Sequence, residues 1–199
     1  MYNRCFALAA MRFILASSSP RRSELLRNAG IAFDVVPAQI PEEPLRGERP
    51  QQTAERLALE KAQAVFRRYP DAAVLGADTV VVVDDDLLAK PADDSDAARM
   101  LRRLSGRAHE VITGVALLWP GGRDVRSEST QVYFSRLAGD EIAAYIASRE
   151  PMDKAGAYGI QGLASRWIPR VEGCYFNVVG LPVALVYHML REAAVLDGR

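Results

Sequence analysis

Residues 13–22 read Phe13-Ile14-Leu15-Ala16-Ser17-Ser18-Ser19-Pro20-Arg21-Arg22, an apolar run, a serine-rich turn and the start of a helical pattern. Ser19 is a typical N-cap and proline favours the first helical position, so this segment predicts a strand, a turn and a helix. Two arginines then lie in the first helical turn, where the dipole disfavours cations by about 0.3–1 kcal/mol each. A phosphate at this helix end would offset that cost, which makes Ser17 and Arg22 candidate phosphate ligands. The alternative is an ordinary strand–turn–helix with solvated arginines.

The composition limits the possible classes of protein. The chain has 199 residues, 49% of them hydrophobic, which is enough for an α/β domain whose core needs no metal or disulfide. Its 25 basic and 25 acidic residues balance, which argues against nucleic acid or a membrane surface as a partner. Two cysteines are too few for a disulfide framework and indicate a reducing, cytoplasmic compartment. We expect residues 1–10 to be a loosely ordered extension and residues 11–199 to form one domain.

Strand-like and helical segments mix along the chain without strict βαβ alternation. This pattern predicts an α/β fold with a central, mixed, twisted sheet, flanking helices and a substrate cleft. Residues 151–166 are rich in glycine and predict an irregular loop, and Asp84-Asp85-Asp86 predicts a solvated hairpin turn. The expected strands are residues 13–16, 33–36, 73–75, 80–83, 87–89, 111–119, 131–134, 167–171 and 175–179, and the expected helices are residues 20–30, 51–69, 95–104, 140–148 and a last one from 182.

Lysine is scarce in this chain. Only three of the 25 basic residues are lysines, namely Lys61, Lys90 and Lys154. Because lysine is a compact point charge on a flexible stem, these positions are candidates for sites that need a single ammonium group, unless their retention is chance. Lys61 follows Leu57 by four residues and therefore falls within the apolar helical stripe. It either points into a cleft or extends its stem to the surface.

Asp78 is the strongest single candidate for chemistry. It lies in Gly76-Ala77-Asp78-Thr79, between two apolar segments typical of buried strands. A carboxylate there is costly unless it is paired, metal-bound or facing a cleft. The alternative is a turn aspartate that bonds its own backbone.

Two further side chains are weaker candidates. Glu42 lies in a proline-rich loop and would matter if it shared a divalent ion with a second carboxylate. Gln161 carries both a donor and an acceptor, which suits reading the edge of a base, although a backbone-bonded loop glutamine is the more ordinary interpretation. The phosphate-binding P-loop, the dinucleotide fingerprint and the nucleophile elbow are all absent from the sequence.

Taken together, these motifs resemble those of the Maf family of nucleotide pyrophosphatases. The resemblance covers about residues 12–190 and includes all three lysines. The matching segments are Ser17-x-Ser19-Pro20-Arg21-Arg22, Leu59-Glu60-Lys61-Ala62, Gly76-Ala77-Asp78-Thr79, Lys90-Pro91, Ser105-Gly106-Arg107-Ala108-His109-Glu110-Val111-Ile112-Thr113-Gly114 and Asp153-Lys154-Ala155-Gly156-Ala157-Tyr158-Gly159-Ile160-Gln161-Gly162.

The resemblance implies a Maf/ITPase-like fold and hydrolysis of a nucleoside triphosphate to the monophosphate and pyrophosphate, with Mg²⁺ or Mn²⁺. It makes Asp78 the proton acceptor, with Glu42 in the same pocket. Residues 157–162 resemble the branch that acts on dTTP and UTP, whereas a sister branch prefers 7-methyl-GTP. The resemblance further implies a homodimer. The positions linked to substrate choice are Arg21, Thr79 and Gln161.

The chemistry of the substrate agrees with these residues. A triphosphate must have its negative charge neutralised before water can attack the α-phosphorus, which Arg21, Arg22, Lys61, Lys90 and a metal held by Asp78 and Glu42 would do. Metal ligation and activation of the water compete for the Asp78 carboxylate, and the sequence does not divide these two roles. Gln39 and Pro41 depart from the usual family pattern in the Glu42 loop. A non-enzymatic nucleotide-binding regulator of septum formation is the alternative from a different class.

Overall fold

Three long antiparallel strands form the middle of the sheet in the computed structural model, which describes residues 11–43, 45 and 47–196. They are β3 (Ala73–Val83), β5 (Ala108–Trp119) and β6 (Gly122–Tyr133). The extension expected at residues 1–10 lies outside the described part of the chain.

Shorter strands extend the sheet on both sides of this centre. β1 (Phe13–Leu15) runs parallel to β3, and β2 (Asp34–Val35) runs parallel to β1. β7 (Arg170–Glu172) pairs antiparallel with β6, and β4 (Asp86–Leu88) returns antiparallel along β3. The order β2-β1-β3-β5-β6-β7 combines parallel and antiparallel pairs, which confirms the predicted mixed sheet.

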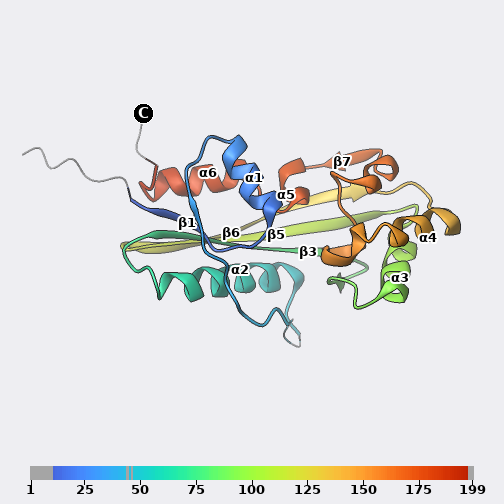
Figure 1. Ribbon diagram of the computed structural model, residues 1–199, viewed down its shortest axis with the longest axis horizontal. Coiled ribbons are helices and arrows are strands. Elements are labelled where there is room, and N and C mark those ends of the chain that lie inside the picture. Colours follow the sequence, from blue (N-terminus) through green and yellow to red (C-terminus); the bar gives the residue numbers. More distant parts are fainter. Residues whose placement is uncertain (1–10, 44, 46, 197–199) are drawn as a thin grey trace, which may run out of the picture.

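Helices cover both faces of the sheet (Figure 1). α2 (Pro50–Phe66) lies along one face, and α1 (Pro20–Asn28) and α6 (Val183–Glu192) lie on the other. α3 (Asp94–Leu104) and α4 (Gly139–Ala147) lie toward one end of the long strands. Within the described residues, no helix combines the length and the apolarity that a bilayer crossing needs.

Two glycines bring α2 unusually close to the sheet. A Cβ atom on Gly76 would lie 2.1 Å from the Ala58 carbonyl oxygen, and one on Gly114 would lie 2.3 Å from the Ala54 carbonyl oxygen. The helix backbone therefore packs directly on β3 and β5, with no side chain between them at these points. This close approach sets the height of Lys61 above the sheet.

β3 is one continuous strand, so the prediction of two strands separated by residues 76–79 is wrong. β5 pairs with β3 at every position from Val74 to Val82, and this pairing outweighs the low strand preference of Gly76 and Asp78. On its other edge β3 meets β1 at residues 73–75 and β4 at residues 81–83. That edge therefore has a gap at residues 76–80 in the described structure.

Other differences from the predicted elements have similar causes. Residues 175–179 form the helix α5 (Tyr175–Val179) instead of a strand, because the Gly180 N–H bonds back to the Phe176 and Asn177 carbonyls. Gly180 has a φ of 123°, which ends the helix at a conformation that favours glycine. β6 starts nine residues before the predicted position 131, since β5 pairs with its polar first half as well. The predicted loop 151–166 contains short 3₁₀ helices.

His109 is buried in the core, where its ring packs edge-on against Phe134 and Tyr158. Its Nε2 lies 2.8 Å from the Tyr158 hydroxyl. Burial lowers the pKa of His109 from 6.5 to about 4, because the charged ring loses its hydration. The unfolded chain therefore binds a proton between these two values and the folded chain does not.

Stability should accordingly fall as the pH drops through this window. The contribution of neutral His109 to stability is fully present above about pH 6.5. We expect the free energy of unfolding, measured with urea, to fall by about 2 kcal/mol between pH 7.5 and pH 5. His109→Gln should remove this part of the pH dependence. His188→Gln, at an exposed position, should retain it, and an identical pH profile in all three proteins would contradict the assignment.

Candidate active site

A cavity of about 760 Å³ lies along the gap in the β3 edge. Side chains alternate between the two faces of a strand, so Asp78 points toward α2 and Thr79 toward α1. Both reach the same cavity because no neighbouring strand covers residues 76–80 on that edge in the described structure. All nine residues predicted for the site line this cavity: Ser17, Arg21, Arg22, Glu42, Lys61, Asp78, Thr79, Lys90 and Gln161.

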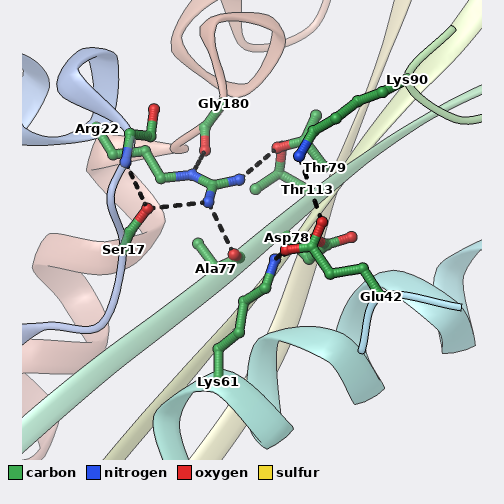
Figure 2. A network of polar contacts seen from close by, with 11 residues as sticks. Ser17, Arg22, Glu42, Lys61, Ala77, Asp78, Thr79, Lys90, Thr113 and Gly180 are labelled. Carbon is green, nitrogen blue, oxygen red and sulfur yellow. Dashed lines mark hydrogen bonds and ion pairs between the residues drawn. The ribbon is translucent and has the colours of Figure 1, made fainter. Parts of the chain in front are cut away.

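Lysines and carboxylates form a cluster on the α2 side of the cavity (Figure 2). The Lys61 ammonium lies 2.6 Å from Asp78 Oδ1 and 2.7 Å from Glu42 Oε1. Lys90, on the far side of Glu42, lies 3.4 Å from Glu42 Oε2. Lys61 and Asp78 are 7% and 8% exposed, which decides between the two interpretations of Lys61. It is paired inside the cleft and does not extend to the surface.

Glu42 is held in its charged form by this cluster. Partial burial raises the pKa of Glu42, but hydrogen bonds and charge from Lys61 and Lys90 outweigh burial and leave the pKa below its ordinary value. The cluster thus offers two cations and two carboxylates at one wall of the cavity. Such a wall can bind an anion and a cation together, as a metal-complexed polyphosphate requires.

Arg22 occupies the other side of the gap and joins four segments of the chain. Its Nε donates to the Gly180 carbonyl at 2.8 Å, and its Nη1 donates to the Ala77 carbonyl at 2.9 Å and to Ser17 Oγ at 3.3 Å. Its Nη2 donates to Thr79 Oγ1 at 3.1 Å. Arg22 therefore takes the place of a strand partner for Ala77. A guanidinium group has five N–H donors, so one remains for a ligand.

Ser17 complements Arg22 at the end of β1. Its hydroxyl oxygen accepts from the Ser19 N–H at 3.2 Å and from Arg22. Both lone pairs are then used, and the hydroxyl hydrogen is left to donate into the cavity. α1 begins at Pro20 as predicted, although the Ser19 side chain makes no cap bond to the helix. A free donor beside a helix N-terminus suits a phosphate oxygen.

The third wall comes from the segment between α4 and β7. Gln161 is exposed at the cavity, and Arg21 lies 3.7 Å from Asp153 across it. Lys154, the third lysine, bonds the Glu150 carbonyl at 2.5 Å and Asp153 at 2.6 Å. The three residues that the family resemblance links to substrate choice thus come from α1, β3 and this segment. Only the folded chain brings them together.

The comparison with known protein families decides the classification. The family model described as Maf-like protein matches residues 12–193. The chain belongs to the Maf family. A relative from Koribacter versatilis named dTTP/UTP pyrophosphatase is 58% identical, over 94% of this chain and 96% of that protein. A relative from Syntrophomonas wolfei with the same name is 52% identical, over 89% of this chain and 95% of that protein.

One solved structure has a fold similar to that of this Maf chain. The Staphylococcus aureus Ham1 protein aligns with a TM-score of 0.50 at 12% identity, covering 92% of this chain and 99% of that one. At this identity the likeness concerns the fold alone. It agrees with the mixed sheet and flanking helices expected for the chain.

Sequence reasoning missed a residue that supports the Gln161 segment of this Maf chain. The Glu150 carboxylate accepts from the Leu163 N–H at 3.1 Å and from the Tyr145 hydroxyl at 2.9 Å. A Cβ on Gly162 would lie 2.1 Å from Glu150 Oε1, so a larger residue at position 162 would displace this carboxylate from the Leu163 N–H. The signal was present, because a glycine beside a candidate site residue often marks a close approach.

A second missed group supports Glu42. Arg56, on α2, donates to both oxygens of Glu48 at 2.8 and 2.9 Å and to the Glu43 carbonyl at 3.0 Å. The hydrogen bond from Arg56 is the main cause that lowers the pKa of Glu48 to about 2. Arg56 thereby holds the loop that carries Glu42 against α2. No sequence periodicity links a loop glutamate to a helix arginine eight residues later.

The carboxylates of the site suit a magnesium or manganese ion. Within the described residues no group of three or more histidine, cysteine or acidic side chains gathers as a complete metal cage. Mg²⁺ is commonly held by one or two carboxylates, with substrate phosphates and water completing its shell. Asp78 and Glu42, whose oxygens both lie within 2.7 Å of one ammonium nitrogen, match that donor set.

Proposed function

We propose that this chain is a nucleoside triphosphate pyrophosphatase that hydrolyses dTTP and UTP to the monophosphate and pyrophosphate. The observation that carries the proposal is that Asp78, Lys61, Lys90, Arg21 and Arg22 all line the same cavity. Its cations suit a polyphosphate chain, and its carboxylate suits activation of water. The substrates follow from the name shared by the relatives that cover nearly the whole chain.

The reaction assigns a task to each group. Water attacks the α-phosphorus, the bond from that phosphorus to the bridging oxygen breaks, and pyrophosphate leaves with the electron pair. Asp78 accepts the proton from the attacking water. Lys61, Lys90 and the remaining N–H of Arg22 neutralise phosphate charge, and the Ser17 hydroxyl donates to a phosphate oxygen. When substrate enters, its phosphates exchange for the carboxylates that now pair with Lys61 and Lys90.

A divalent cation, Mg²⁺ or Mn²⁺, belongs to this proposal, with Asp78 and Glu42 as its protein ligands. It would supply charge neutralisation on the phosphates. We further propose a homodimer, on the family resemblance, and a cytoplasmic location, on the low cysteine content of the chain. Neither of these two proposals affects the chemistry at the cavity.

The decisive experiment measures pyrophosphate release from a panel of triphosphates with Mg²⁺ or Mn²⁺. The panel contains dTTP, UTP, dCTP, GTP and 7-methyl-GTP. We expect release from dTTP and UTP that stops when EDTA is added. Preference for 7-methyl-GTP would place the chain in the sister branch, and binding without release would make it a nucleotide-binding regulator.

Gln161 should control which base is accepted. We expect Gln161→Ala to change the ratio of pyrimidine to purine turnover by about tenfold, because a side-chain amide contributes one or two hydrogen bonds to a base edge. The measurement is kcat/KM for dTTP and GTP. Leu163→Ala, an exposed side chain in the same segment and outside the cavity lining, is the control. An equal loss for both substrates would remove the base-reading role.

A further inference from the structure

A line of hydrogen bonds runs from the cavity into the core on the α1 side of β3. Arg22 Nη2 lies 3.1 Å from Thr79 Oγ1, which lies 2.9 Å from Thr113 Oγ1 (Figure 2). Thr113 Oγ1 lies in turn 3.1 Å from the backbone carbonyl of Asn177. Thr113 is fully buried, whereas Thr79 is half-buried and lines the cavity.

The far end of this line fixes the direction of its hydrogen bonds. A carbonyl oxygen has no hydrogen, so Thr113 must be the donor to Asn177. The Asn177 side chain holds that carbonyl in place, since its Nδ2 donates to the Val111 carbonyl and to Thr130 Oγ1, both at 2.9 Å. A hydroxyl has a single hydrogen. Having given it to Asn177, Thr113 can only accept from Thr79.

The opposite direction is disfavoured by the burial of Thr113. If Thr113 donated to Thr79, its lone pairs would face the Asn177 carbonyl oxygen at 3.1 Å. Thr113 is 0% exposed, so water cannot separate the two oxygens. An unmade hydrogen bond of this kind costs about 1–3 kcal/mol in a buried place.

The same reasoning defines what Thr79 can offer a ligand. Its hydrogen is committed to Thr113, and one lone pair accepts from Arg22, which leaves one lone pair facing the cavity. Thr79 is therefore an acceptor only. Ser17 has the opposite character, because both of its lone pairs are occupied and its hydrogen is free. At the cavity, the Ser17 hydroxyl is thus a donor and the Thr79 hydroxyl an acceptor.

We propose that Thr113, held by Asn177, positions Thr79 as a hydrogen-bond acceptor, and that Thr79 selects nucleosides that present an N–H or O–H donor to it. The inference rests on the proposed function and adds the polarity of the contact. Two parts of a pyrimidine nucleotide offer such a donor. One is the imide N3–H of thymine and uracil, which cytosine replaces with an acceptor, and the other is a hydroxyl of the sugar.

Two pairs of substrates separate these sources. The first pair is dTTP and dCTP, and the second is dTTP and 2′,3′-dideoxythymidine triphosphate, which lacks the sugar hydroxyl. We would measure kcat/KM for each in the wild-type protein, Thr79→Val, Thr113→Val and Thr113→Ser. Thr113→Val keeps the shape of the side chain but frees the Thr79 hydrogen to turn toward the cavity. Thr113→Ser keeps a hydroxyl that donates to the Asn177 carbonyl and accepts from Thr79.

In one of the two pairs, the ratio of kcat/KM for dTTP to that for its competitor should fall about tenfold in both valine variants. In Thr113→Ser the same ratio should stay at the wild-type value. The pair that responds identifies the base or the sugar as the donor. Preferences unchanged within twofold in both pairs for both valine variants would overturn the inference, as would a uniform loss on all substrates. Thr79→Val tests the acceptor even if Thr113→Val unfolds, which thermal melting would reveal. Failure of the wild-type protein to release pyrophosphate from dTTP and UTP would instead defeat the proposed function itself.

Discussion

Asp78→Asn should reduce kcat for dTTP by about 10³-fold while the protein remains folded. Asparagine has nearly the same shape, and its amide oxygen can still accept from Lys61, which lies 2.6 Å from Asp78 Oδ1. It cannot accept the proton of the attacking water, and it is a poorer ligand for a divalent cation. Loss of a general base alone costs about 10²–10⁴-fold. The measurement combines pyrophosphate release with thermal unfolding of the same preparation.

Asp85→Asn is the matched control for this variant. Asp85 is exposed in the turn between β3 and β4 and has a φ of 62°, a conformation that asparagine tolerates well. This control removes one negative charge from the end of the same strand without touching the cavity. We expect it to retain wild-type activity. Activity of Asp78→Asn within threefold of wild type would exclude Asp78 from the mechanism.

Gly76→Ala should destabilise the fold by about 3 kcal/mol or more and lower activity as well. The added Cβ would lie 2.1 Å from the Ala58 carbonyl oxygen and 2.7 Å from the Ala62 backbone nitrogen. Backbone atoms cannot move aside as a flexible side chain can, so α2 must shift away from β3. Overpacking of this kind typically costs about 1–3 kcal/mol, and contacts with backbone lie at the upper end.

The effect on activity follows from the position of Lys61 on the same helix. A shift of α2 would separate Lys61 from Asp78 and from the phosphates, and a misplacement of about 1 Å can cost 10²-fold in rate. Gly139→Ala, at the start of α4, is the control, because a Cβ there meets no atom within 4 Å. Urea unfolding should show a change below about 0.5 kcal/mol in the control. Equal stability of Gly76→Ala and wild type would mean that α2 does not rest on β3 as described.

Local patterns in the sequence were sufficient for much of the fold and for naming nine side chains that line the cavity. The apolar stripe of α2 predicted a helix with Lys61 on its inward side, and Lys61 is buried there. The serine-rich turn and Pro20 predicted the start of α1, which begins at Pro20. These features depend on periodicity and capping within a few residues, which a single segment encodes by itself.

Features that depend on distant partners were missed or wrongly predicted. β3 is unbroken because β5 pairs with it from Val74 to Val82, and residues 175–179 are helical in spite of their aromatic and branched side chains. Strand preference is a weak guide wherever tertiary pairing competes with it. The supporting roles of Glu150 and Arg56 could not be predicted for the same reason, because the packing of loops determines their hydrogen-bond partners.

The sequence by itself determined which chemical groups this protein has: a carboxylate at position 78 between apolar segments, three lysines among 25 basic residues, and a serine and two arginines at a helix start. The tertiary structure decided what those groups can do. A gap between β1 and β4 opens one edge of β3 and lets Asp78 and Thr79, on opposite faces, reach one cavity. Hydrogen-bond partners more than thirty residues away then make Thr79 an acceptor. No local pattern records that direction, because it is set by the Asn177 carbonyl at the far end of the line of hydrogen bonds.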